Sequence, residues 1–140
     1  MMFYITGRYY PRLPSRIPTH FDNRGQINGW GSKESVWLLP ATAFVLFVLL
    51  SFAHRFPNLM NFPVRVTPEN AQRQYDLART FLRVIKASML FLFLLLQWMT
   101  LSAALGLQTL LNKPGTLIAL SCTLIFLPAM VYFYSAFRNR

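Results

Sequence analysis

Acidic side chains are scarce in this 140-residue sequence: four Asp and Glu stand against fourteen Lys and Arg, which gives a formal net charge of +10. Charged residues of both signs make up only 13% of the chain, whereas 54% is hydrophobic and 16% is aromatic. A soluble domain of this size needs more polar surface than that composition supplies. The sequence therefore predicts a chain that lies largely in lipid.

Cysteine and histidine are also rare, and this limits the chemistry that the chain can perform. Cys122 is the single cysteine, so neither a disulfide framework nor a cysteine metal site is available. His20 and His54 flank opposite ends of an apolar run and are expected to lie a membrane thickness apart. A triad of Ser15, His20 and Asp22 can be drawn, but no group forms an oxyanion hole beside it. We predict no enzymatic activity, no metal and no cofactor.

Three long runs contain no charged side chain, and each reaches the length of a membrane-spanning helix, about 20 residues. They cover residues 35–53, 87–112 and 114–137. The predicted fold class is an all-α membrane protein with three transmembrane helices, an amphipathic interfacial helix and an outer turn-rich loop. The single membrane domain, residues 1–140, then comprises an outer loop segment (1–34), span 1 (35–53), a surface loop (54–66), the amphipathic helix (67–86), span 2 (87–111) and span 3 (115–137).

The basic residues flank the apolar runs, a pattern typical of juxtamembrane charge. No RNA- or DNA-binding motif accompanies them, so we predict no nucleic-acid partner. With three crossings, six Lys and Arg lie on the side of the N-terminus and eight lie on the other side. The positive-inside rule then places the N-terminus outside and the C-terminus in the cytoplasm.

The segment from Pro14 to Lys33 is the densest polar stretch, and it leads directly into the first apolar run. Its prolines favour extended backbone, and its turn residues follow them. These turn residues are Asn23, Gly25, Asn28 and Gly29. We expect a compact loop that contains a short hairpin, in which residues 20–21 pair with residues 26–27 and which ends at Trp30.

Two interpretations of this loop remain open. In the first, His20 hydrogen-bonds a backbone group inside the loop. In the second, aromatic and basic side chains form an outward recognition surface for a peptide or a lipid headgroup, because loops on rigid scaffolds often carry recognition. The candidate recognition loop comprises His20, Arg24, Trp30 and Lys33.

The amphipathic helix has a clear start signal, with Thr67 as N-cap and Pro68 at the first helical position. Apolar side chains then recur at helical spacing as far as Ile85. The expected local ion pairs are Glu69–Arg73 and Asp76–Arg79. Nothing breaks the pattern before span 2, so one long helix with a polar first half is also consistent with the sequence.

Small and polar residues interrupt span 2. Ser102 and Gly106 stand four residues apart and predict close packing of helix backbones. Gln97, the candidate intramembrane polar residue, either bonds to a neighbouring helix or contacts a ligand or ion.

Span 3 is expected to follow a tight turn over residues 112–115, which makes it an antiparallel neighbour of span 2. Pro128 predicts a kink within it. Tyr132 and Tyr134 are expected at the membrane interface, just before the final basic residues.

Several short motifs together resemble a bacterial family of small integral membrane proteins of unknown function. The same domain opens the larger immunity proteins that protect sporulating bacilli from the sporulation-delaying peptide toxin. The motifs are Pro11-Arg12-Leu13-Pro14, Ile17-Pro18-Thr19-His20-Phe21, Gly25, Asn28-Gly29-Trp30-Gly31-Ser32-Lys33, Leu38-Leu39-Pro40, Arg55-Phe56-Pro57, Asn61-Phe62-Pro63-Val64, Thr67, Glu69-Asn70-Ala71 and Gln74-Tyr75.

The resemblance implies a multi-pass protein of the bacterial plasma membrane with the patterned loop on the outer face. Members of the family carry another spanning helix before the Tyr-Pro-x-Leu-Pro element, whereas only Met1–Tyr10 precedes it here. We therefore expect the first spanning helix to be missing, through either a late start or a start codon placed too far downstream. The second half of the larger immunity proteins is absent from this sequence, so their role does not transfer directly.

The function that we favour is a non-enzymatic binding, immunity-type or signalling module of the membrane. Its expected partners are the lipid bilayer and a peptide or another membrane protein, and its oligomeric state stays open. A transporter or channel component is the alternative, although the chain offers no intramembrane charge for such a role. A purely structural membrane subunit is the third possibility.

Overall fold

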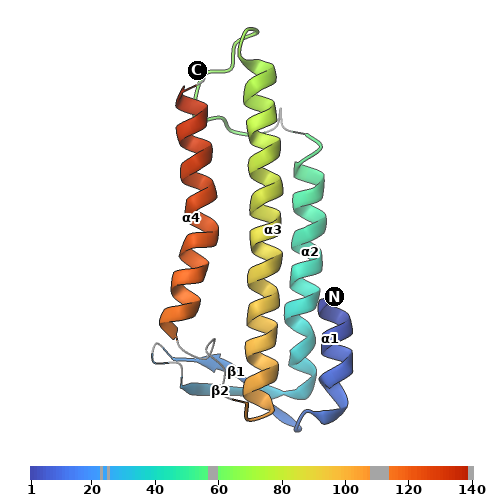
Figure 1. The fold of residues 1–140 in the computed structure, drawn as a ribbon. Helices are drawn as coiled ribbons and strands as arrows, with labels where there is room; N and C mark the ends of the chain where they lie inside the picture. Colours follow the sequence, from blue (N-terminus) through green and yellow to red (C-terminus); the bar gives the residue numbers. More distant parts are fainter. Residues whose placement is uncertain (23, 25, 57–59, 108–113, 139–140) are drawn as a thin grey trace.

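The computed structural model is a bundle of long helices with a small β-hairpin at one end (Figure 1). It describes residues 1–22, 24, 26–56, 60–107 and 114–138. The described elements are α1 (Met2–Tyr9), the 3-10 turn η1 (Tyr10–Arg12), β1 (Arg16–Phe21), β2 (Ile27–Ser32), the 3-10 turn η2 (Lys33–Trp37), α2 (Leu38–Ala53), α3 (Ala71–Ala104) and α4 (Pro114–Arg138). α3 packs against both α2 and α4, and the hairpin lies where α3 ends (Figure 1).

Three helical segments are long and apolar enough to cross a membrane: Lys33–Ala53, Ala71–Ala104 and Ala119–Arg138. Their most apolar stretches have mean hydropathies of 2.3, 1.8 and 1.7, yet only 17%, 22% and 11% of these stretches is buried. Apolar surface of this extent is stable in lipid and unfavourable in water. The prediction of a mostly helical, multi-pass membrane protein is therefore confirmed, and a small two-stranded sheet accompanies the helices.

α1 corrects the expectation that residues 1–34 form a loop, because eight of these residues are helical. A helix this short depends on tertiary packing for its stability. Phe3 stacks on Trp37 with ring centroids 6.3 Å apart, and the ring centroids of Tyr10 and Trp37 are 5.8 Å apart. Thr6 is completely buried. These contacts hold α1 against η2 and α3, beside the first part of α2 (Figure 1).

The predicted amphipathic helix and span 2 form a single helix, α3, of 34 residues. It begins at Ala71 rather than after Thr67, because Asn70 Oδ1 accepts the Thr67 backbone N–H at 2.8 Å and holds residues 67–70 in a turn. The predicted pair of Asp76 and Arg79 is present at 3.2 Å. With a rise of about 1.5 Å per residue, α3 is about 51 Å long, which exceeds the roughly 30 Å of a hydrocarbon core. Part of α3 therefore extends beyond the hydrocarbon.

α3 ends at Ala104, seven residues before the predicted end of span 2. The N–H groups of Gly106 and Leu107 donate to the carbonyls of Ala103 at 3.1 Å and Ser102 at 2.8 Å, and Gly106 has a φ of 70°. These bonds define a Schellman motif, in which glycine accepts the left-handed conformation. Ser102 is buried as predicted, whereas Gly106 is exposed and closes the helix. The prediction that Gly106 packs against another helix is wrong.

α4 matches the predicted span 3 and packs along α3. Tyr132 is only 7% exposed and stacks on Phe81 with ring centroids 4.6 Å apart, so it packs between helices, and its position at the membrane interface stays a prediction. Tyr134 is exposed, and Pro128 lies inside the helix. The turn predicted over residues 112–115 falls partly on residues 108–113, which lie outside the described part of the chain.

Candidate functional site

The predicted hairpin is present, and it extends two residues beyond Trp30. β1 and β2 pair in antiparallel fashion from Arg16 opposite Ser32 to Phe21 opposite Ile27, with irregularities between residues 18 and 21. Its tip is built on Asp22, whose Oδ1 accepts the backbone N–H groups of residues 24 and 26, each at 2.8 Å. The predicted turn residues Asn23 and Gly25 lie outside the described residues.

One side of β1 fixes the hairpin to the bundle. Ile17 is completely buried in a cluster with Leu13, Val36 and Leu101, which come from the chain before β1, from η2 and from α3. Burying an isoleucine side chain contributes about 1.5–3 kcal/mol of hydrophobic stabilisation. The hairpin is therefore held in one orientation by the same residues that close this end of the bundle.

Two glycines in β2 allow the strands to approach closely. A Cβ atom at Gly31 would lie 2.6 Å from Thr19 Cγ2 and 2.8 Å from Ser35 Oγ. A Cβ atom at Gly29 would lie 2.8 Å from the Cβ of His20. Neither distance is compatible with a side chain in an unaltered structure. His20 is consequently seated directly against the β2 backbone.

The four residues of the candidate recognition loop do not form one surface. His20 and Trp30 occupy nearby positions on the paired strands, and both are exposed. Arg24 is exposed at the tip. Lys33 lies at the base, where its Nζ is 4.4 Å from the centre of the Tyr10 ring, a cation–π contact that engages the charge within the fold.

The outer edge of β2 is available for pairing. The Lys33 N–H donates to the Ser15 carbonyl at 3.0 Å, which marks a hydrogen-bonded pair at the hairpin base. Hydrogen-bonded and non-bonded pairs alternate along an antiparallel ladder, so the backbone groups of Trp30 and Ser32 point away from β1. The Ser32 carbonyl accepts a hydrogen bond from Ser35 Oγ, which leaves the Trp30 groups as the part of this edge that a further strand can reach. Within the described part of the chain the sheet has only these two strands. β2 itself, Ile27–Ser32, contains no proline and no charged residue.

Gln97 lies completely buried beneath the hairpin, between α3, α1 and η2. Its Nε2 donates to Thr6 Oγ1 at 2.8 Å and to the Val36 carbonyl at 3.3 Å. Its Oε1 is also buried and has no hydrogen-bond partner among the described residues. The geometry gives Gln97 the interhelical bond that the sequence allowed, and the alternative role, contact with a ligand or ion, stays a prediction.

At the opposite end of the bundle, His54 joins α2 to α3. Arg83 Nε donates to His54 Nε2 at 2.9 Å, so the imidazole accepts on that nitrogen. Desolvation lowers the pKa of His54, and the nearby positive charges, with Arg83 and Lys86 foremost, lower it further. Lys86 Nζ also donates to Ser51 Oγ at 3.2 Å and lies 5.0 Å from the ring centre of Phe47. These contacts fasten the end of α2 to α3.

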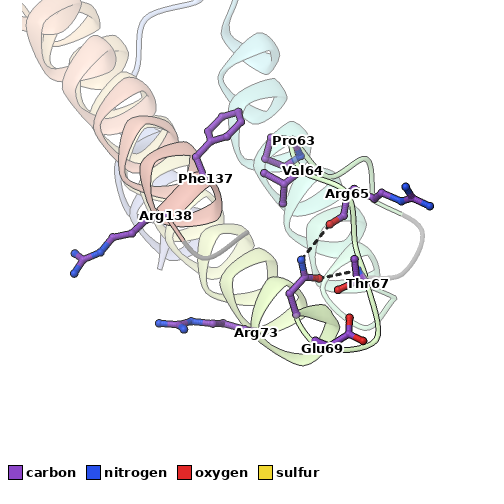
Figure 2. A pocket seen from close by; sticks show the side chains of 9 residues that line it. Pro63, Val64, Arg65, Thr67, Glu69, Arg73, Phe137 and Arg138 are labelled. Atoms are coloured by element: carbon purple, nitrogen blue, oxygen red, sulfur yellow. Dashed lines mark hydrogen bonds between the residues drawn. The ribbon is translucent and has the colours of Figure 1, made fainter.

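A second feature at this end is a cavity of about 710 Å³ between the loop before α3 and the end of α4. We call it the arginine pocket, because its basic lining residues are Arg65, Arg73 and Arg138. Figure 2 shows Phe137 above the pocket and Glu69 at its lower rim. It is thus a mixed surface, cationic on some sides and apolar on another.

The sequence pattern did not predict the arginine pocket. Basic residues beside the spans were visible in the sequence, but these three arginines belong to a loop and two helices. Only the packing of α4 along α3 brings them to the lining of one cavity. The role of Asn70 was not predicted either: its side chain hydrogen-bonds the backbone of the loop at Thr67 and Arg65 and fixes the shape of that loop. Among the described residues, no group of three or more His, Cys, Asp or Glu is placed to hold a metal.

Comparison with known proteins finds similarity over parts of the chain. Residues 1–44 match a family model described as a domain of unknown function (DUF1648). An uncharacterised protein of Archaeoglobus fulgidus is 32% identical over 62 residues, which cover 39% of this chain and 34% of that protein. The match thus spans about a third of the archaeal relative. No solved structure matches the chain.

Proposed function

We propose that this membrane protein is a non-enzymatic recognition module whose hairpin binds an extended peptide at the membrane surface. The observation that carries the proposal is the outer edge of β2, where the outward backbone groups of Trp30 adjoin the exposed apolar side chains of Trp30 and Ile27. Trp30 is 53% exposed and Ile27 is 37% exposed. An uncharged, proline-free edge strand is the template that peptide recognition by strand addition uses.

The partner that fits this surface is a peptide with alternating apolar and acidic side chains. Its backbone would pair with the outward groups of β2, and one apolar side chain would contact Trp30. Arg16, Arg24 and His20 are exposed on the same hairpin. Asp22, whose Oδ1 accepts two backbone N–H groups of the tip, offsets part of this charge, and Arg16 and Arg24 leave the hairpin net positive. Complementary charge accelerates encounter and discriminates between partners more than it raises affinity.

The hairpin is proposed to face outward, with the C-terminus in the cytoplasm of a bacterial plasma membrane. The distribution of Lys and Arg, six on the hairpin side and eight on the other, supports this orientation. A single cysteine introduced at Ser32, with Cys122→Ser to remove the native thiol, tests it. We expect a membrane-impermeant maleimide to label the introduced cysteine in intact cells. Labelling that requires lysis would reverse the orientation.

Binding can be measured on the purified protein in detergent. The probe is a short synthetic peptide of alternating valine and glutamate, and the signals are tryptophan fluorescence and the infrared amide band of β-structure. We expect saturable binding that Trp30→Ala weakens. Phe52→Ala is the matched control, because Phe52 is a similarly exposed aromatic residue (62%) at the other end of the bundle. Equal binding by the unaltered protein, Trp30→Ala and Phe52→Ala would show that the hairpin does not bind the peptide.

An immunity-type role makes a separate prediction in cells. Bacteria that express the chain should survive a membrane-active peptide better than cells without it, and Trp30→Ala should reduce this protection. The same variant must still insert at normal levels, which a membrane fractionation would show. Protection that is unchanged by the substitution would mean that the hairpin does not provide it.

A further inference from the structure

The arginine pocket lies at the level where α4 leaves its charge-free run. Residues 114–137 contain no charged side chain, and Arg138 follows them directly. Gln74 Nε2 donates to the Ala136 carbonyl at 3.3 Å, so the first turns of α3 lie beside this end of α4. Lipid headgroups occupy the layer directly outside the hydrocarbon. The pocket is therefore placed within reach of phospholipid headgroups.

Within the described part of the chain, the arginines of this pocket lack an acidic partner at ion-pair distance. No ion pair joins Arg65, Arg73 or Arg138 to a carboxylate among the described residues. Glu69 is the acidic group in the lining, and the predicted Glu69–Arg73 pair does not form. The Thr67 side chain and the Glu69 backbone N–H hydrogen-bond this carboxylate and lower its pKa.

The next acidic side chain along α3 is also engaged elsewhere. Asp76 accepts hydrogen bonds from Arg79 and from Gln72, each at 3.2 Å. The cavity is therefore lined by three arginines and a single carboxylate. Figure 2 shows the Arg73 and Arg138 side chains extending to one side and the Arg65 side chain extending to the other. A bound anion would complete the charge balance.

The loop that carries Arg65 is held in place before any ligand arrives. Asn70 Nδ2 donates to the Arg65 carbonyl at 3.1 Å, while its Oδ1 accepts the Thr67 N–H at 2.8 Å, as the dashed lines in Figure 2 show. A loop that is ordered in advance loses less conformational entropy on binding. Asn70 thus acts as the positioning residue for one wall of the pocket.

We propose that the arginine pocket binds the phosphate group of an anionic phospholipid headgroup. Guanidinium groups match phosphate oxygens through paired N–H donors, and they are less strongly hydrated than ammonium groups. Free phosphate shares this chemistry, but the apolar lining by Pro63, Val64 and Phe137 favours a ligand that also brings glycerol and acyl carbon to the site. This site is distinct from the hairpin, and it stands independently of peptide recognition.

The test is lipid binding by the purified full chain in detergent, measured by native mass spectrometry. Phosphatidylglycerol is the anionic probe, phosphatidylcholine is the zwitterionic comparison, and inorganic phosphate is the soluble competitor. We expect phosphatidylglycerol to bind in preference to phosphatidylcholine. The combined variant Arg65→Gln/Arg73→Gln/Arg138→Gln should lower its affinity about tenfold or more, because hydrogen bonds to charged groups contribute at least that factor.

A charge-matched control variant distinguishes a specific lipid site from non-specific electrostatic attraction. Arg8→Gln/Arg12→Gln/Arg24→Gln removes the same charge at the hairpin end, and it should leave phosphatidylglycerol binding within about twofold, since distant exposed charges are screened. Equal losses in both variants would overturn the proposal. Binding of inorganic phosphate as tight as that of the lipid would overturn the lipid assignment. Arg138→Gln alone, at the exposed end of α4, should also weaken binding, which keeps the test valid if the combined variant misfolds.

Discussion

Gln97 and Thr6 are hydrogen-bonded side chain to side chain at 2.8 Å, although 91 residues separate them in the chain. Both are completely buried, and the same Gln97 amide nitrogen also reaches the Val36 carbonyl. One amide group therefore joins α1, η2 and α3 directly beneath the hairpin. The hairpin's orientation depends on this junction, because Val36 is also part of the cluster around Ile17.

Replacing Gln97 with leucine should lower the free energy of unfolding by about 1–2 kcal/mol, since two hydrogen bonds between elements are lost. Equilibrium unfolding in detergent, followed by tryptophan fluorescence, measures the change. In a double-mutant cycle with Thr6→Val, we expect a coupling energy of about 1 kcal/mol. Thr100→Val is the control, because that hydroxyl bonds only to the Leu96 carbonyl in its own helix. Zero coupling would contradict the bond between Gln97 and Thr6.

The same substitution at two glycines should have opposite effects on stability. Gly106 has a φ of 70° and no atom within 4 Å of an added Cβ, so Gly106→Ala costs about 1 kcal/mol through backbone conformation alone. Gly7 is inside α1, and its Cβ would make an ordinary contact of 3.8 Å with Trp37. Gly7→Ala should therefore stabilise the protein by about 0.4–1 kcal/mol. Thermal unfolding of the two variants measures both changes in stability. Changes of the same sign would contradict the prediction.

His54 should make stability depend on pH in the weakly acidic range. Its pKa in the folded protein lies below the ordinary value of 6.5, so the unfolded chain binds the proton first as pH falls. Stability is accordingly full above about 6.5 and is lost as pH falls through the folded-state pKa. An NMR titration of the imidazole should give a midpoint below the ordinary value, and Arg83→Gln should raise it. Arg73→Gln serves as the comparison and should leave the midpoint unchanged, while a midpoint above 6.5 in the unaltered protein would refute the assignment.

Alanine at Gly31 should disrupt the hairpin while leaving the chain in the membrane. The added Cβ would collide with Thr19 and Ser35, and relief requires the strands to separate. Hydrogen exchange should show faster exchange at the β1 and β2 amides, with the α3 amides unchanged. Ala substitution at Asn28, an exposed neighbour in the same strand, is the control and should have little effect. Unchanged β2 protection in Gly31→Ala would mean that the close approach is not required.

Elements that depend on local pattern were predictable from the sequence. Long charge-free runs require lipid whatever their neighbours, so the three membrane-crossing helices followed from counting residues. The hairpin followed from the extended backbone that proline favours and from the turn residues beyond it, although Asn28 and Gly29, which were expected in a turn, lie in β2. Each of these rules acts over a few adjacent residues.

Elements that depend on distant contacts were not predictable. α1 is stabilised by Trp37 and Gln97, which lie far along the chain, and nothing within Met2–Tyr9 indicates those partners. Tyrosine is typical of the membrane interface, but the stacking of Tyr132 on Phe81 could not be predicted, because Phe81 belongs to another helix far earlier in the chain. Gly106 illustrates a third limit, since the same glycine is compatible with helix packing and with helix termination. Only its backbone angle distinguishes the two.

α3 is one continuous helix from Ala71 to Ala104, so it joins the hairpin end of the bundle to the pocket end. Leu101 belongs to the cluster under the hairpin, and Arg73 lines the pocket at the far end of the same helix. Under the proposed peptide binding at the hairpin, a rotation of α3 at that end would move Arg73 at the other end through the same angle. Occupancy of the hairpin would then alter the arginine pocket without any change in the length of α3.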